Sequence, residues 1–396
     1  MDFIESFLGE TKLSLSSVKE YLWQHPTKLR RLVVALLKNS SILVVVAVLA
    51  LLGYKYIRNR RVRVFCMDTA RNKKIIEQLR PQIERYSPTL YMPFSMMKVV
   101  VAATGKLISL EKYLRQDILL SDGEICHLDC YPRTFRTLPA ATPIVVFVPG
   151  IFGTSFDKYA FEFCKMAYDS MGWRSFVLNR RLFVSPCKGK KLLSYNHYED
   201  WRQIFQKLKV DYPAAPIYLV GVSMGSMNIQ RYLIEYKDDP IVEAAATVSS
   251  PFDAGKTADT IHSNPLLRKS FHSTMVFMFR QHLHHEGFME LCRQKGICVE
   301  SVLNSKDNKD FDKKFAALDH GMPIQEYYKS LSSYSHMDEI TVPLLSINSG
   351  DDPVIKSHAI PMHKILDNPN IIQLMVAGGG HIEYFHGLKC EYVTPH

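Results

Sequence analysis

Short apolar runs alternate with amphipathic stretches through most of the chain after residue 140. Six runs carry apolar residues at consecutive positions, as strands buried on both faces do. They are "PIVVFVPG" (143–150), "RSFVLN" (174–179), "PIYLVGVS" (216–223), "VEAAATVSS" (242–250), "VPLLSINSG" (342–350) and "IIQLMVAGGG" (371–380). Between them, three stretches have the apolar spacing of helices: "FEFCKMAYDSMG" (161–172), "YEDWRQIFQKLKVDYP" (198–213) and residues 226–236. Strands that alternate with helices predict right-handed β-α-β crossovers, and therefore a mostly parallel, doubly wound α/β sheet.

The alternation breaks between Pro251 and Pro343, where the sequence is helix-rich. We predict a helical lid at about 253–338, inserted into an α/β core of residues 141–390. Apolar residues gather in the lid at Met275, Phe277, Met278 and Phe279. They either meet an apolar ligand such as an acyl chain or, as is more common in a helical insertion, form the lid's own core. Residues 64–140, which end in the alternating stretch "DGEICHLDCYP" (122–132), are interpreted as the N-terminal part of the same domain.

Residues 32–56 are interpreted as a membrane anchor, preceded by a polar segment at 1–31. The chain has no charge from Asn39 to Tyr54, and "ILVVVAVLALL" (42–52) is continuously aliphatic. A buried core helix is the alternative, but it would show polar positions every three or four residues. The segment starts too far from Met1 for a cleaved signal peptide. We therefore expect a single-pass protein of the endoplasmic reticulum or another endomembrane.

The net charge of +10 is concentrated beside this segment. The flanking basic residues are Lys28, Arg30, Arg31 and Lys38 on one side and Lys55, Arg58, Arg60, Arg61 and Arg63 on the other. This pattern favours anionic lipid headgroups over nucleic acid as a partner, and the sequence has no zinc-finger spacing. Because the two sides carry similar charge, the side of the membrane on which the main domain lies stays open.

The cysteines lie far apart, which favours reduced thiols over a disulfide scaffold. Cys126, His127, Asp129 and Cys130 are close enough in sequence to suggest a metal site. On a strand, however, Cys126 and Cys130 share one face while His127 and Asp129 share the other. We therefore expect no metal site there.

Chemistry-bearing residues follow three of the predicted strands. "GVSMG" (221–225) places Ser223 between a strand and a helix, the context of a nucleophile elbow. A glycine turn with an uninvolved serine is the alternative. His381 follows the last predicted strand in "AGGGHIEY" (377–384) and is the candidate general base.

The candidate acid is one of two neighbouring aspartates in "NSGDDPV" (348–354), which follows the strand at 342–348. Asp352 is favoured because Pro and Val come after it, where the chain turns over the site; Asp351 then caps the turn. The expected oxyanion donors are the backbone N–H of Ile151, in "VPGIFGTS" (148–155), and that of Met224. The order serine, acid, histidine matches the α/β-hydrolase arrangement.

Further motifs extend this agreement beyond the serine. They are "YMP" (91–93), "DGEICHLD" (122–129), "PGIFGTS" (149–155), "LNRR" (178–181), "FDKKF" (311–315), "EYYKSLSS" (326–333), "ITVPLLSINSGDDP" (340–353) and "GGGH" (378–381). From about Tyr91 to Gly387 the sequence resembles the type 4 AB-hydrolase family. Within it, the chain is most similar to the membrane-anchored abhydrolase-domain-containing phospholipases and lipid esterases of the one-to-three branch. One departure is Leu182, which follows "LNRR" where the family tends to have glycine; a second is the lack of an H-x-x-x-x-D acyltransferase signature.

By this resemblance Ser223, Asp352 and His381 form a catalytic triad on an α/β-hydrolase fold. The resemblance implies a serine hydrolase of glycerolipid esters at the bilayer, with phospholipase A1-type cleavage of phosphatidylcholine and no metal or cofactor. A general carboxylesterase or monoacylglycerol lipase is the alternative within enzymes. A catalytically silent lipid- or protein-binding module is the alternative of another class. The oligomeric state stays open.

Overall fold

The computed structural model describes residues 45, 48–54, 57, 61–86, 108–184, 187–192, 198–382, 384–386 and 391–392. The chain divides into two compact units, Met1–Lys55 and Tyr56–His396. The predicted segment 1–31 and most of the predicted anchor 32–56 lie outside the described residues. Within the described ranges, none of the helices combines the length and the hydropathy that a bilayer crossing needs.

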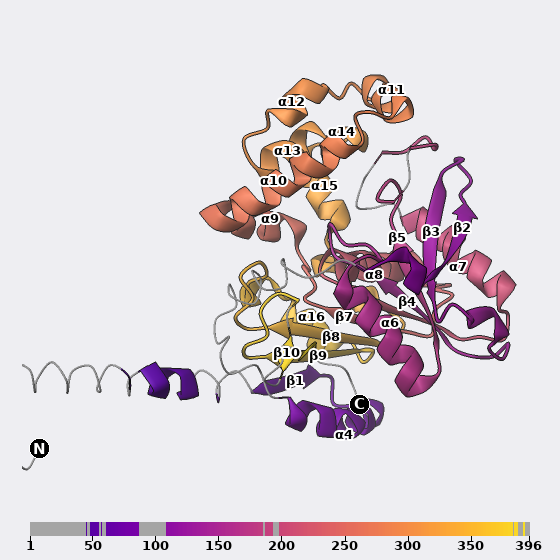
Figure 1. Cartoon of the computed structure of the whole chain (residues 1–396). Coiled ribbons are helices and arrows are strands. Elements are labelled where there is room, and N and C mark those ends of the chain that lie inside the picture. The colour runs from indigo at the N-terminus through magenta and orange to yellow at the C-terminus, as the bar shows by residue number, and fades with distance from the viewer. Residues whose placement is uncertain are drawn as a thin grey trace, which may run out of the picture. The chain divides into compact units, whose positions relative to one another are not determined.

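A mostly parallel sheet forms the centre of the second unit, as predicted (Figure 1). Its nine strands in the described residues are β1 (Val62–Cys66), β2 (Leu114–Leu119), β3 (Ile125–Tyr131), β4 (Ile144–Val148), β5 (Arg174–Asn179), β6 (Ile217–Val222), β7 (Ala244–Val248), β8 (Leu344–Ser349) and β9 (Ile371–Val376). Their order is β1-β9-β8-β7-β6-β4-β5-β3-β2. Strands β4 to β9 are parallel to one another, whereas β1 pairs antiparallel with β9 and β3 antiparallel with β5 and β2. The short strands β10 (Phe385–His386) and β11 (Glu391–Tyr392) form a separate pair.

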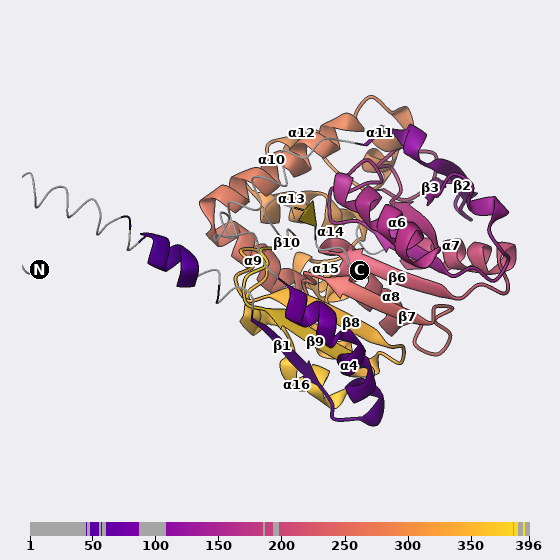
Figure 2. The ribbon, with the colours of Figure 1, turned by 60° about the horizontal axis from the view of Figure 1, so that its bottom comes forward.

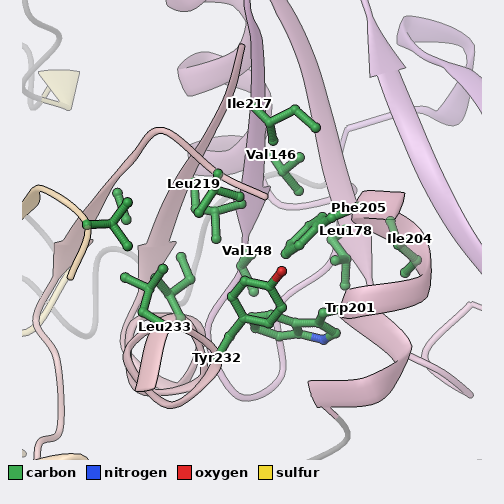
Figure 3. Close-up of a cluster of buried hydrophobic side chains, with 14 of the residues drawn as sticks. Val146, Val148, Leu178, Trp201, Ile204, Phe205, Ile217, Leu219, Tyr232 and Leu233 are labelled. Atoms are coloured by element: carbon green, nitrogen blue, oxygen red, sulfur yellow. The ribbon is translucent and has the colours of Figure 1, made fainter. Parts of the chain in front are cut away.

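Strand β4 shows why the parallel strands read as unbroken apolar runs, because every residue of it is buried. Val146 and Val148 pack into the cluster beneath α7 (Tyr198–Asp211) and α8 (Met224–Glu235), with Trp201 and Tyr232 (Figure 3). Phe147 points the other way and packs with α6 (Lys158–Met171). Helices on both faces therefore leave no polar face on the strand.

The helices that pack on the sheet follow the predicted positions. Helix α6 ends at Gly172, which adopts φ = 69°, the left-handed conformation that favours glycine as a helix cap. The described part also contains α4 (Ala70–Arg85), α16 (Met362–Asp367) and the 3₁₀ turns η1 (Leu110–Lys112), η2 (Phe135–Thr137), η3 (Tyr334–Glu339) and η4 (Ser357–Ala359). The apolar periodicity did not indicate β1 or β2.

The helix-rich segment between β7 and β8 forms a layer with its own apolar core (Figures 1 and 2). Its helices are α9 (Ala254–Ser263), α10 (Pro265–Gln281), α11 (Glu286–Gln294), α12 (Val299–Leu303), α13 (Asn308–Lys314), α14 (Ala316–Asp319) and α15 (Ile324–Leu331). We call this layer the lid. Phe279 packs edge-on against Phe288 and Phe315 in the lid core, while Phe277 is 58% exposed. Phe279 therefore serves the lid's own packing.

Candidate active site

Ser223 lies in a sharp turn between β6 and α8. Its backbone adopts φ = 52° and ψ = −120°, a strained conformation for a residue with a side chain. The Ser223 N–H donates to the Val248 carbonyl at 2.8 Å, which ties the turn to β7. A strained turn between a strand and a helix, held in place by a neighbouring strand, is the geometry that "GVSMG" predicted.

The two glycines of "GVSMG" are required by close packing. A Cβ on Gly225 would lie 2.2 Å from the carbonyl oxygen of Val148, and one on Gly221 would lie 2.8 Å from the carbonyl of Gly225. Both distances are shorter than any van der Waals contact, so a side chain at either position would force helix and strand apart. The glycines set how closely α8 approaches β4 and β6.

The structure brings Ser223 together with His381 and Asp352, which are far apart in sequence. His381 Nε2 lies 2.7 Å from Ser223 Oγ, and His381 Nδ1 lies 2.8 Å from Asp352 Oδ2. His381 and Asp352 are buried. Since a carboxylate only accepts, Nδ1 carries the proton toward Asp352, which leaves Nε2 to accept from the serine hydroxyl. The arrangement is able to remove a proton from Ser223.

Asp351 and Asp352 have different partners. Asp352 Oδ1 accepts hydrogen bonds from the N–H groups of Val354 (2.7 Å) and Ile355 (2.9 Å), which orients its other oxygen toward His381. Asp351 Oδ1 instead accepts from the N–H groups of Gly379 and Gly380, each at 3.0 Å. Asp351 therefore holds the loop that carries His381 and does not contact the imidazole itself.

Two tyrosines also support the His381 loop, one from a distant part of the chain and one just after His381. Tyr86, directly after α4, donates its hydroxyl to the Gly378 carbonyl at 3.1 Å, and burial raises the pKa of this phenol. The ring of Tyr384 lies so close to Gly379 that a Cβ there would be 2.4 Å from it. The sequence reasoning missed both residues, because a lone tyrosine has no periodicity or motif that reports its partner.

Ile151 and Met224, the expected oxyanion donors, line the same cavity as Ser223. Met224 is the first residue of α8, so its N–H is among those without a partner inside the helix, at the positive end of the helix dipole. The loop that carries Ile151 is held by the Arg180 guanidinium, which donates to the carbonyls of Pro149 (2.7 Å), Gly150 (2.8 Å) and Ile151 (3.2 Å). Arg180 therefore fixes the carbonyls of this loop beside the Ser223 turn.

A buried polar network anchors the far end of this loop. Arg115 donates two hydrogen bonds to Asp129, at 2.8 and 2.7 Å. Asp129 also accepts from Ser155 Oγ (2.5 Å) and from Asn179 Nδ2 (2.8 Å), while Asn179 Oδ1 accepts from the Ser155 N–H (2.9 Å). Asp129, one of the four residues considered for a metal site in the sequence, thus joins β3, β5 and the Ile151 loop.

Leu182, the departure noted after "LNRR", has a backbone conformation that favours glycine. Its backbone has φ = 67°, a left-handed conformation that strains any residue with a Cβ. The Leu182 side chain is buried in the lid core. Packing against the lid offsets the backbone strain at this position.

A cavity extends from Ser223 between the sheet and the lid. Its empty volume is about 650 Å³, part of it open to solvent. Most of the lining is apolar and includes Met227, Ile261, Phe271, Met275, Leu331 and Val354, and two polar residues of α13 are also part of it. Met275, one of the apolar lid residues singled out in the sequence, therefore borders the cavity.

The cysteines of β3 lie in the core. Cys126 and Cys130 are both buried, and burial raises the pKa of each thiol. Each cysteine in the described ranges is free of disulfides. Among the described residues, no group of three or more His, Cys, Asp or Glu side chains is placed to hold a metal ion.

Comparison with known proteins gives the same fold. Residues 143–388 match the family described as "alpha/beta hydrolase fold". The chain belongs to this family.

Phospholipase ABHD3 of Bos taurus is 28% identical to this α/β-hydrolase over 77% of the chain and 74% of its own length. The human protein of that name is 28% identical over 78% of the chain and 70% of its own length. A monoacylglycerol lipase of Saccharomyces cerevisiae is 26% identical over 62% of the chain and 55% of its own length. The resemblance to abhydrolase-domain phospholipases is thereby confirmed.

Proposed function

We propose that this α/β-hydrolase is a membrane-anchored serine esterase that cleaves fatty-acyl esters of glycerolipids, with phospholipase A1-type action on phosphatidylcholine. Its class is that of a carboxylic ester hydrolase, as in its phospholipase and lipase relatives. The finer assignment rests on the site. The observation that carries it is the chain of two hydrogen bonds from Ser223 through His381 to Asp352 at the edge of an apolar cavity.

The proposed reaction has two halves. In the first, His381 takes the hydroxyl proton while Ser223 Oγ attacks the ester carbonyl, and Asp352 stabilises the imidazolium that forms. The N–H groups of Ile151 and Met224 bind the oxyanion, and the leaving alcohol takes its proton from His381. In the second, water attacks the acyl-enzyme with His381 as base, which releases the fatty acid and restores Ser223. No metal or cofactor takes part.

The apolar cavity supports an acyl chain as the group that binds next to Ser223. Burying a chain of methylene groups stabilises a complex by about 0.8 kcal/mol for each group. The proposed anchor at 32–56 would hold the site close to insoluble substrate and raise its effective concentration. Both features favour a lipid ester over a small soluble ester.

A fluorophosphonate probe tests the proposed nucleophile. The purified protein is expected to become labelled, and Ser223→Ala to abolish the labelling. Ser250→Ala is the control, because Ser250 is a buried serine whose hydroxyl has no hydrogen-bond partner among the described residues. If folded wild-type protein resists the probe, or if Ser223→Ala still becomes labelled, the serine esterase proposal is wrong and the silent binding module is favoured.

Lipid substrates test the finer assignment. Phosphatidylcholine with different acyl chains at its two positions is expected to release the sn-1 chain in the presence of wild-type protein and none with Ser223→Ala. Monoacylglycerol lipase is the second candidate, favoured by the yeast relative. Hydrolysis of monoacylglycerol without hydrolysis of phosphatidylcholine would replace the first assignment by the second.

A further inference from the structure

Two polar residues of lid helix α13 interrupt the apolar wall of the cavity beside Ser223. Asn308 and Asp312 both line it, although only 3% and 9% of their surfaces are exposed. Polar side chains are rarely buried to this extent unless every polar atom has a partner. Asp312 belongs to the "FDKKF" motif, to which the catalytic proposal assigns no role.

One oxygen of each residue lacks such a partner. Asp312 Oδ2 accepts a hydrogen bond from the Tyr328 hydroxyl at 2.9 Å. Asp312 Oδ1 and Asn308 Oδ1 are buried and have no hydrogen-bond partner among the described residues. A buried polar atom without a partner destabilises a fold, because it has given up its hydrogen bonds to water. Because both residues line the cavity, a bound ligand is able to supply the missing hydrogen bonds.

The hydrogen-bonding chemistry of Asp312 Oδ1 and Asn308 Oδ1 limits which functional group of a ligand fits between them and the cavity. Burial raises the pKa of the Asp312 carboxyl to about 7. The hydrogen bond from Tyr328 opposes this rise, whereas the nearby charge of Asp307 adds to it. At neutral pH the carboxyl therefore exists both as an acceptor and as a donor, while the Asn308 carbonyl only accepts. A hydroxyl matches both residues when Asp312 is protonated, because it accepts from the carboxyl and donates to the Asn308 carbonyl; when Asp312 is ionised, it donates to one of the two oxygens. An ester carbonyl cannot donate, and a charged headgroup would lose its hydration in the apolar cavity.

We propose that Asn308 and Asp312 bind an aliphatic hydroxyl of the substrate, so that this α/β-hydrolase cleaves a lipid ester that carries a hydroxyl, including phosphatidylcholine with a hydroxylated acyl chain, faster than the same ester without one. This inference rests on the proposed ester hydrolysis at Ser223. The hydroxyl belongs either to a partly acylated glycerol or to a hydroxylated acyl chain, which present the same chemistry.

The test uses two pairs of esters, measured with the purified full-length protein in detergent micelles. Decanoylglycerol and propyl decanoate differ in the hydroxyls of the alcohol. Methyl hydroxydecanoate and methyl decanoate differ in one hydroxyl of the acyl chain. Wild-type protein is expected to favour the hydroxylated member of at least one pair by about tenfold in kcat/KM, and that pair identifies the source.

Asp312→Leu is expected to bring this preference close to one while the ester without a hydroxyl remains a substrate. Asp310→Leu is the matched control on the same helix, because Asp310 lies outside the cavity and contacts Lys314 and the Lys306 N–H. It is expected to keep the preference. Asp312→Asn, which conserves shape and hydrogen bonding to Tyr328, is expected to retain part of it.

Different results would contradict the hydroxyl site and the proposed ester hydrolysis at Ser223. Equal rates within both pairs for wild-type protein would overturn the hydroxyl site and leave ester hydrolysis intact. If folded Asp312→Leu keeps the preference, or loses the same factor in kcat/KM on both members of a pair, Asp312 does not bind the hydroxyl. Its role is then the structural hydrogen bond with Tyr328. Absence of hydrolysis of all four esters together with absence of Ser223 labelling would overturn both proposals.

Discussion

Asp351 and Asp352 are adjacent in sequence, and side chains of adjacent residues diverge. Asp352 contacts the His381 imidazole, whereas Asp351 contacts the backbone of Gly379 and Gly380. One carboxylate thus orients the His381 imidazole, and the other positions the loop that carries His381. Substitutions of Asp351 and Asp352 are therefore expected to lower kcat for different reasons and by different factors.

Asp352→Asn is expected to lower kcat on a soluble ester by about 10⁴-fold, because an amide would stabilise the wrong imidazole tautomer. Asp351→Ala removes an acceptor from the loop and is expected to lower kcat by about tenfold to a hundredfold through displacement of His381. Asp351→Asn, which retains a carbonyl acceptor, is expected to recover most of that loss. Steady-state kinetics of the three variants would contradict this division if Asp351→Asn were as inactive as Asp352→Asn.

His282 is a titratable residue buried in the lid core. Both ring nitrogens lack a hydrogen-bond partner among the described residues, and the ring lies 5.2 Å from that of Phe288. Burial, together with His285 and His284, lowers the pKa of His282 to about 4. Since the folded pKa lies below the unfolded value, the unfolded chain binds more protons between pH 6.5 and 4. The contribution of His282 to stability is therefore present above about pH 6.5 and lost as the pH falls toward 4.

His282→Phe is expected to remove this acid sensitivity and to keep the contact with Phe288. The free energy of unfolding of wild-type protein relative to the variant is expected to fall by about 1–2 kcal/mol between pH 7 and pH 5. Urea unfolding at the two pH values measures it. A difference that is the same at both pH values would show that His282 titrates normally.

At the scale of elements, the turn between β6 and α8 connects sequence to chemistry. Strand β6 is largely buried, and the first N–H groups of α8 have no partner inside the helix. Gly221 and Gly225 allow the strand and the helix to approach each other closely. The strained backbone of Ser223 persists because neighbouring strands hold both sides of the turn.

Gly225→Ala is expected to destabilise the fold by about 3 kcal/mol or more, because the new methyl group would overlap the Val148 carbonyl. Gly255→Ala in α9 is the matched control, since its Cβ would meet the nearest atom at an ordinary 3.4 Å. Alanine is also the better helix former by about 0.5–1 kcal/mol, so this control is expected to be neutral or stabilising. Thermal unfolding of both variants checks the pair, and equal melting temperatures would refute the packing argument.

At the scale of the whole molecule, the start and the end of the α/β unit meet in one sheet. β1 pairs with β9, and the Ala377 N–H donates to the Arg61 carbonyl at 2.8 Å. The His381 loop follows directly after β9. An N-terminal strand therefore supports the loop that carries the general base of the proposed mechanism.

Two truncations separate the proposed anchor from this supporting strand. A chain that starts at Arg58 keeps β1 and is expected to retain fold and soluble-ester activity but to leave the membrane fraction after alkaline extraction. A chain that starts at Asp68 lacks β1, exposes the edge of β9, and is expected to lose stability and activity. Full-length protein is expected to stay in the membrane fraction; its release by alkaline extraction would contradict an anchor at 32–56.

The sequence by itself determined the parallel core, because strands buried on both faces must be apolar at consecutive positions, as Ile144–Val148 are. It also placed Ser223 and His381 at the carboxyl ends of their strands, since local motifs mark those turns. It did not find β1, whose partner β9 lies some three hundred residues later, because a short edge strand is defined by pairing and not by periodicity. The sequence favoured Asp352 over Asp351, and the tertiary structure places Asp352 against His381. Tertiary structure alone brought Tyr86 to the His381 loop and Tyr328 to Asp312. These contacts join residues distant in the chain, and only the folded backbone sets the direction in which each side chain points.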